Sequence, residues 1–184
     1  MKRLLLLSII LHVGLPGFCQ LAKPNMPFIT LNSDRGYISI NEFTFGAGWA
    51  DEGTPYSQGY LGFTTLHARQ VNERLTAGLG TGLLYYSDGF LIPLYAEGRI
   101  NLKIKSIVPY LSASGGVLFN PSGTGTGTYL FITPAFGVMS PLSGNMAVNI
   151  SGGCLMQIAP KTGSRQFING KAGITYKFKG KRQR

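Results

Sequence analysis

The sequence predicts an all-β protein, an eight-stranded antiparallel up-and-down transmembrane β-barrel. The first observation is composition: glycine accounts for 26 of 184 residues, and only 13% of residues are charged although 44% are hydrophobic. This balance favours strands over helices. The second observation is that eight strand-like segments follow one another between clusters of turn-forming residues. The third is that apolar and polar side chains alternate along several segments, with the period of two that a strand imposes.

Residues 1–19 are predicted to be a secretory signal peptide. A charged start leads into an apolar run at residues 4–15, which is too short to span a bilayer as a helix. Gly17 and Cys19 then put small residues at the −3 and −1 positions of a cleavage site before Gln20. The protein is therefore expected to be secreted.

The barrel is predicted over residues 37–178, after an N-terminal extension at 20–36 and before a basic tail at 179–184. Its strands are expected at residues 37–49, 58–71, 74–86, 90–102, 107–119, 128–139, 146–158 and 166–178. Segments of this length cross the hydrocarbon layer when they are tilted by about 40°. Tyrosines and Trp49 fall near strand ends, as interfacial girdles require. Because the number of strands is even, both termini are expected in the periplasm.

The closing strand shows two distinct faces. From Ile168 to Phe178 every second residue is apolar or small, whereas the positions between them include Lys171 and Lys177. A polar inward face and an apolar outward face are typical of a membrane barrel, which has lipid around it. A soluble lipocalin-like barrel that binds an apolar ligand is an alternative, in which the two faces would be inverted. The first two strands alternate less clearly, and Glu42 or nearby glycines are expected to mark a β-bulge there.

Charge is distributed unevenly along the chain. The formal net charge is +10, and all seven acidic residues lie within the first 97 positions. Charges that face a narrow interior must be paired. We therefore predict an interior network of the acids and bases on inward positions, with the first and last strands joined at their seam by Glu42 and Lys171. The members of this network are Glu42, Glu97, Arg99, Lys171 and Lys177.

The basic residues occur at turns, in the tail or singly on strands, and they do not line one helix or groove. No nucleic-acid partner is therefore predicted. Anionic membrane headgroups are the expected counter-charge for this surface.

Three stretches carry a family resemblance: LTAGLGTGLLYYSDGFLIPLYAEGRINL at residues 75–102, VPYLSASGGVLFN at 108–120 and TPAFGV at 133–138. Together with the closing strand, they make residues 37–178 resemble the small outer-membrane β-barrel proteins common in Bacteroidetes. The resemblance implies a location in the cell outer membrane, contact with outer-membrane lipid and lipopolysaccharide, and insertion by the barrel assembly machinery. It implies no reaction.

The closing strand also resembles the terminal signal that the barrel assembly machinery reads. Lys171 supplies the polar residue, Gly173 the glycine two positions later, and Tyr176 and Phe178 supply the aromatics three and five positions beyond the glycine. The resemblance implies that these four residues act in barrel assembly. One departure is the KGKRQR tail after Phe178, since many such proteins end on the aromatic residue.

No catalytic residue, metal site or cofactor is predicted. The alternate glycines of residues 78–82 lie within one strand, so they are expected to make room inside a narrow barrel and not to bind a dinucleotide. The mature chain holds one histidine, His67, and one cysteine, Cys154, which match no metal-ligand spacing. The residue two positions after His67 is Arg69, where resemblance to outer-membrane deacylases would require a serine.

The sequence therefore predicts an integral outer-membrane barrel with a structural or surface-interaction role and no wide pore. An outer-membrane lipid-modifying enzyme is the alternative. Such an enzyme would be recognised by a polar cluster on the lipid-facing side of the barrel, in which His67 lies beside a serine or an acid.

Overall fold

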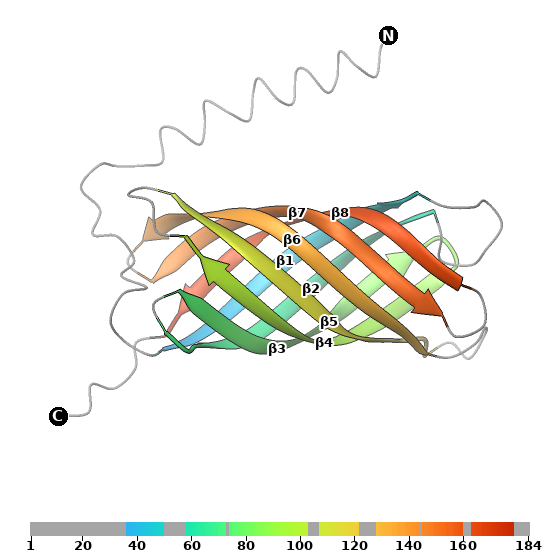
Figure 1. Cartoon of the computed structure of the whole chain (residues 1–184), viewed down its shortest axis with the longest axis horizontal. Coiled ribbons are helices and arrows are strands. Elements are labelled where there is room, and N and C mark those ends of the chain that lie inside the picture. Colours follow the sequence, from blue (N-terminus) through green and yellow to red (C-terminus); the bar gives the residue numbers. More distant parts are fainter. Residues whose placement is uncertain are drawn as a thin grey trace, which may run out of the picture.

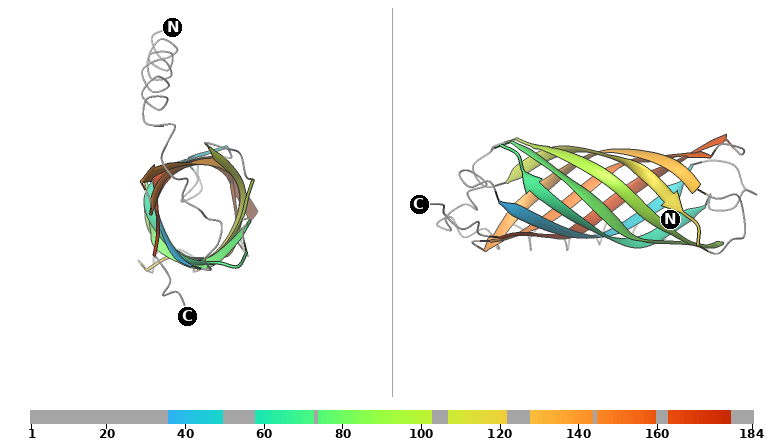
Figure 2. Two further views of the ribbon diagram at one scale, coloured as in Figure 1. Left: turned by 90° about the vertical axis from the view of Figure 1, so that its left-hand side faces the viewer. Right: turned by 90° about the horizontal axis from the view of Figure 1, so that it is seen from below.

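The computed structural model of the chain describes residues 36–49, 58–72, 74–102, 107–121, 128–143, 145–159 and 163–178. They form eight strands: β1 (Tyr37–Gly48), β2 (Gly59–Gln70), β3 (Leu75–Tyr86), β4 (Gly89–Asn101), β5 (Val108–Phe119), β6 (Thr128–Ser143), β7 (Met146–Ala159) and β8 (Gly163–Lys177). Each strand pairs antiparallel with its neighbours in the sequence, and β1 pairs with β8 to close the barrel (Figure 1). Figure 2 shows the closed ring of strands from one end. The predicted fold class is confirmed.

The eight strands begin and end within a few residues of the predicted positions, except that β6, which was expected to end at Met139, continues to Ser143. The predicted signal peptide and basic tail lie outside the described residues, as does the N-terminal extension apart from Gly36. No helix among the described residues is long and apolar enough to cross a membrane.

The two ends of the barrel are distinguished by the terminal strands. Ile38 near the start of β1 pairs with Lys177 at the end of β8, and we call this end the terminal rim. At the opposite end Gly48 of β1 pairs with Phe167 of β8, and we call that end the loop rim. Both described chain ends therefore meet at one rim, as an even number of strands requires.

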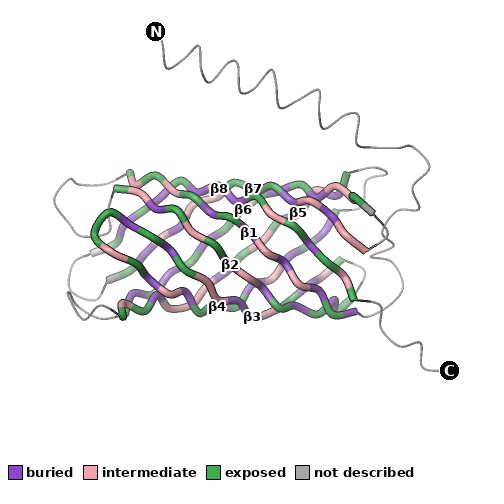
Figure 3. The backbone as a smooth tube through the Cα atoms, turned by 180° about the vertical axis from the view of Figure 1, so that it is seen from behind, coloured by how far each residue is buried: buried purple, intermediate pink, exposed green. Residues whose placement is uncertain are grey.

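Burial alternates along the strands as the sequence predicted (Figure 3). On the closing strand Ile168 is 57% exposed and Ile174 is 45% exposed, whereas Asn169, Lys171 and Thr175 are buried in the interior. Large apolar side chains on the other strands are likewise exposed on the outer surface. The apolar rows therefore lie on the outer surface, as in a membrane barrel. A lipocalin-like barrel would have them on the inside.

The predicted β-bulge at Glu42 is wrong. β1 pairs in unbroken register with β2 and with β8, and the irregularity that the structure records lies between Pro141 and Ser143 of β6. The weak alternation of β1 has another cause. Near the terminal rim its inward residues are apolar, including Ile38, and its outward residues are polar, including Ser39. Polarity along the strand therefore reverses without any change in register.

The interior is filled by side chains in layers. Towards the loop rim lies an apolar layer of aromatic and branched residues: Tyr60, Leu84, Tyr86, Leu91, Tyr129, Phe131, Leu118, Leu155 and Phe167. A second apolar group lies towards the terminal rim and includes Val108, Tyr110, Met139 and Ala147. A narrow eight-stranded barrel has an interior just wide enough for side chains to fill.

The tyrosines are divided between the two faces, which corrects the expectation that they form girdles. Five of the nine point inward and are buried: Tyr60, Tyr86, Tyr95, Tyr110 and Tyr129. Tyr37, Tyr85 and Tyr176 are exposed on the outer surface near strand ends, as Trp49 is. The physical reason is volume, because large planar rings fill the space inside a narrow eight-stranded barrel.

Gly80 of β3 shows how the interior accommodates these rings. It pairs with Tyr95 of β4, and an ideal Cβ at position 80 would lie 2.3 Å from Cζ of the Tyr95 ring. Tyr95 is 6% exposed and packs edge-on against Phe131. A methyl group at position 80 would therefore force the ring against its neighbours. The packing explanation of the alternate glycines holds at this position.

We expect Gly80→Ala to lower the free energy of unfolding by about 1–3 kcal/mol, because overpacking displaces a buried ring. The matched control is Gly98→Ala on the outer face of β4, where a Cβ would meet nothing within 4 Å. That change is expected to stay within about 0.5 kcal/mol. Urea unfolding of the refolded protein, followed by circular dichroism, measures both. Equal effects of the two changes would contradict this explanation.

Candidate functional site

Four ionised side chains meet inside the barrel and form what we call the charged cluster: Glu42 of β1, Glu97 and Arg99 of β4, and Lys171 of β8. Arg99 Nη2 lies 2.8 Å from Glu42 Oε1, and Arg99 Nε lies 2.5 Å from Glu97 Oε1. Lys171 Nζ lies 3.8 Å from Glu42 Oε2 and 3.7 Å from Glu97 Oε2. Two carboxylates and two cations give the cluster no net charge, and all four residues are buried.

Strand geometry explains how these residues meet. Glu97 and Arg99 are two residues apart on β4, so they share the inward face. At the seam between β1 and β8, Glu42 pairs with Gly173 and Lys171 pairs with Thr44. A Cβ at position 173 would lie 2.8 Å from Glu42 Cγ and 2.1 Å from a backbone oxygen. Gly173 therefore leaves the space that the Glu42 side chain uses.

Further polar side chains support the charged cluster. Asn149 of β7 donates a hydrogen bond from Nδ2 to Glu42 Oε1 over 2.5 Å, and Thr175 Oγ1 donates to Asn149 Oδ1 over 3.2 Å. The guanidinium of Arg99 lies over the Tyr110 ring, 5.0 Å from its centroid. Alternation along β7 and β8 is enough to place Asn149 and Thr175 on inward faces, but neither residue was predicted as a member of the network. Their contacts depend on the relative heights of separate strands, which alternation does not give.

Lys177 is not brought into the charged cluster. It lies on the inward face of β8 at the terminal rim, three inward positions beyond Lys171, and its Nζ donates a hydrogen bond to Gln70 Oε1 over 2.9 Å. At about 3.3 Å of strand per residue, the two lysines stand roughly 20 Å apart along the chain. The distance along β8 therefore separates Lys177 from the two glutamates.

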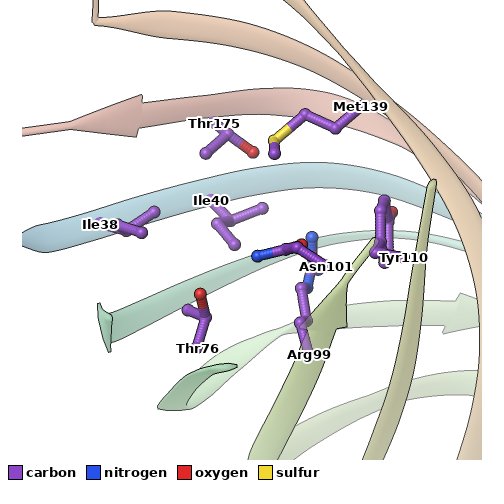
Figure 4. A pocket seen from close by; sticks show the side chains of 8 residues that line it. All are labelled: Ile38, Ile40, Thr76, Arg99, Asn101, Tyr110, Met139 and Thr175. Carbon is purple, nitrogen blue, oxygen red and sulfur yellow. The ribbon is translucent and has the colours of Figure 1, made fainter. Parts of the chain in front are cut away.

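Small cavities lie on either side of the charged cluster. The one nearer the terminal rim has a volume of about 20 Å³ and is lined by Arg99, Asn101 and Tyr110 among others (Figure 4). The one nearer the loop rim also has a volume of about 20 Å³ and is lined by residues that include Lys171 and Asn169. Each cavity can hold about one water molecule. These spaces are too small for a substrate.

The charged side chains of the cluster pair with one another. Arg99 contacts Oε1 of both carboxylates, and Lys171 lies within 4 Å of Oε2 of both. Within the described ranges, no group of three His, Cys, Asp or Glu side chains gathers where it could hold a metal ion.

His67 points outward and belongs to a polar group on the outer surface. Its Nδ1 is hydrogen-bonded to the Tyr37 hydroxyl, and the two rings stack with centroids 5.9 Å apart. Ser39 pairs with His67 across β1 and β2, and Asn41 Nδ2 donates to Ser39 Oγ over 3.4 Å. We call the group formed by three cross-strand pairs the lateral patch: Tyr37 with Arg69, Ser39 with His67, and Asn41 with Thr65.

The lateral patch has one feature expected of a lipid-modifying enzyme, because a serine, Ser39, lies opposite His67. A hydrolytic triad also needs an acid to orient the histidine, and here Nδ1 is bonded to Tyr37. Among the acids that the structure describes, Glu42 and Glu97 point inward and Asp88 lies in the β3–β4 turn at the loop rim. Within the described residues, the geometry gives a polar surface without an orienting carboxylate.

Of the four residues predicted to form the assembly signal, Lys171, Gly173 and Tyr176 lie in the second half of β8, and Phe178 follows directly after its end. Lys171 is inside in the charged cluster, and Gly173 lies at the seam. Tyr176 and Phe178 are on the outer surface at the terminal rim, with ring centroids 4.7 Å apart. Phe178 also packs against Tyr37, with centroids 5.1 Å apart. Their part in assembly stays a prediction.

A closed antiparallel barrel with an apolar outer surface and an ion-paired interior has the fold of the transmembrane β-barrels. Comparison with solved structures gives the same class. Neisserial surface protein A is 16% identical, with a TM-score of 0.54 over 78% of this chain and 97% of its own. The N-terminal β-barrel domain of OprF from Pseudomonas aeruginosa is 12% identical, with a TM-score of 0.53 over 79% of this chain and 100% of its own.

A de novo designed transmembrane β-barrel is 18% identical, with a TM-score of 0.51 over 79% of this chain and 98% of its own. At these identities the likeness shows the fold alone. No protein-family model matches the sequence, and no curated protein matches it significantly.

Proposed function

We propose that this protein is an integral barrel of the cell outer membrane, with a structural or surface-interaction role. The observation that carries the proposal is the outer surface. Large apolar side chains are exposed on all eight strands; they include Phe43 (68%), Leu61 (67%), Leu79 (71%) and Phe136 (54%). Soluble proteins rarely expose continuous apolar surfaces of this extent. We call this ring of exposed apolar side chains the apolar belt. Lipid tails surround such a belt in membrane barrels.

The proposed role does not include a wide pore. The layer near the loop rim is closed by side chains that are almost completely buried, among them Tyr86 (1%), Leu91 (0%), Leu118 (0%) and Phe167 (0%). The charged cluster fills the level below it. An aqueous channel needs a wider barrel, such as the 16–18 strands of porins.

In this proposal the terminal rim faces the periplasm and the loop rim faces outward, where loops contact surface partners or lipopolysaccharide. The signal peptide directs secretion, and Lys171, Gly173, Tyr176 and Phe178 guide insertion by the barrel assembly machinery. The outward position of both aromatic rings at the terminal rim supports this last step, because an assembly factor reaches them from outside. Membership of the Bacteroidetes-type family is part of the same proposal.

Arginine substitutions at two depths on one strand test the membrane location. Leu94 lies midway along β4, and Leu102 lies just beyond its end; both are on the outer face, 47% and 45% exposed. Leu94→Arg is expected to lower the free energy of unfolding by about 2–4 kcal/mol in lipid, and Leu102→Arg by about 0–1 kcal/mol, because the penalty follows depth in the bilayer. Guanidinium titration in liposomes measures both values.

Carbonate extraction and heat-modified gel mobility of the wild-type protein complete this test. An integral barrel stays in the membrane fraction and migrates differently when unboiled. A soluble barrel would be extracted, and two surface arginines would cost it about equally little. That result would rule the proposal out.

A further inference from the structure

The outer surface of β1 and β2 differs from the rest of the belt. The three outward cross-strand pairs nearest the terminal rim are the polar pairs of the lateral patch. The next two outward pairs towards the loop rim are apolar: Phe43 with Phe63, and Phe45 with Leu61. At comparable levels β5 and β6 pair Leu111 with Phe136, and β7 and β8 pair Val148 with Ile174. One column of the described belt is therefore amphipathic along the barrel axis.

We propose that the lateral patch binds the phosphodiester headgroup of a glycerophospholipid in the leaflet at the terminal rim. This inference rests on the proposed location in the membrane. Depth is the first argument. A strand residue advances about 2.5 Å along the axis when strands tilt by about 40°. Asn41, four residues beyond Tyr37, then lies about 10 Å from the rim. The patch thus covers the levels of a lipid phosphate and its glycerol esters.

Chemistry is the second argument. Arg69 is exposed and supplies a cation at the rim, where the phosphate lies. His67 is hydrogen-bonded to Tyr37 through Nδ1, which leaves Nε2 for a ligand. In the tautomer that carries its proton on Nε2, this nitrogen is a donor. Ser39 and Asn41 add a hydroxyl and an amide at the next levels, where ester carbonyls accept hydrogen bonds. Among the described residues of the lateral patch none is acidic and Arg69 is basic, so the patch suits an anion.

The surroundings of the patch fit the rest of the lipid. Phe43 and Phe63 lie immediately above it in edge-to-face contact, with centroids 5.4 Å apart. Leu79 of β3 pairs with His67, and Ile174 of β8 pairs with Asn41, so apolar walls flank both sides. An acyl chain attached to a bound headgroup would run along these side chains. The alternative occupant, a second copy of this chain, would bring Arg69 against Arg69 about a two-fold axis, where like charges repel.

Native mass spectrometry of the detergent-purified full chain, mixed with short-chain phosphatidylglycerol, tests the proposal. The double variant Arg69→Gln/His67→Leu is expected to bind the lipid about ten-fold more weakly, because charge-assisted hydrogen bonds to the phosphate are lost. The matched control is Arg74→Gln, which removes an exposed cation directly before β3 at the same rim, outside the lateral patch. Its affinity is expected to stay within about two-fold of wild type.

Three results would overturn the proposal. One is equal binding by the double variant and wild type. Another is displacement of the lipid by inorganic phosphate at the same concentration, which would make the site one for free phosphate. The third is a dimer that dissociates in the double variant, which would assign the patch to a second copy. Heat-modified mobility and carbonate resistance are scored on the same samples. If those hold while lipid binding fails, the headgroup site is wrong and the membrane location stands.

Discussion

Arg99→Met is expected to lower the free energy of unfolding by about 3–5 kcal/mol, because it leaves buried carboxylates without their cation. Arg99 contacts both Glu42 and Glu97, and the three side chains are 1–6% exposed. Lys171 alone would then face two carboxylates at 3.8 and 3.7 Å. Methionine has a similar length and flexibility, so the loss of charge dominates the loss of packing. Guanidinium unfolding in detergent micelles measures the change.

Two further variants separate charge from packing at Arg99. Glu97→Gln/Arg99→Met keeps Glu42 and Lys171 as one neutral pair, so it is expected to be clearly more stable than the single variant. Arg74→Met removes a cation from an exposed turn and is expected to change stability by less than about 0.5 kcal/mol. If the double variant were as unstable as Arg99→Met, the packing of the arginine stem would matter more than its charge, contrary to this explanation.

The sequence was sufficient for the strands and their faces because alternation is a local property of the chain. The inward positions of Asn169 and Lys171 follow from it, and so do the outward positions of Ile168 and Ile174. The pairing of Glu42 with Lys171 followed from a global constraint, since buried charges need partners and no acid follows Glu97. Neither inference required the register between strands.

The parts that sequence reasoning missed depend on register and height. Lys177 shares a face with Lys171 but lies at the terminal rim beside Gln70, and only strand pairing reveals the difference. Ser39 lies opposite His67 because of the β1–β2 register, which alternation along a single strand does not give. The tyrosine positions were ambiguous because an aromatic residue near a strand end suits a girdle as well as an interior layer. Tyr86 is inward while its neighbour Tyr85 is outward.

Phe167→Ala is expected to lower the free energy of unfolding by about 3–5 kcal/mol, because truncating a buried aromatic leaves a cavity that the surroundings fill only partly. Phe167 is 0% exposed, and its ring meets Tyr60 at 5.7 Å and Tyr86 at 6.1 Å between centroids. Tyr86 is held in turn by Gln157, whose Nε2 donates to its hydroxyl over 2.6 Å. These fixed neighbours have little freedom to collapse into the space.

The control for this substitution is Phe136→Ala on the outer face of β6, where the ring is 54% exposed. If lipid surrounds the barrel, acyl chains replace the lost ring contacts, and the cost is expected to be clearly smaller, since lipid tails are as apolar as the side chain. Unfolding in liposomes compares the two variants. The layer near the loop rim also contains Leu91 and Leu118, so Phe167→Ala is expected to remain without stable conductance in planar bilayers. An open channel in that variant would mean that one ring, and not the layered packing of the interior, keeps the barrel closed.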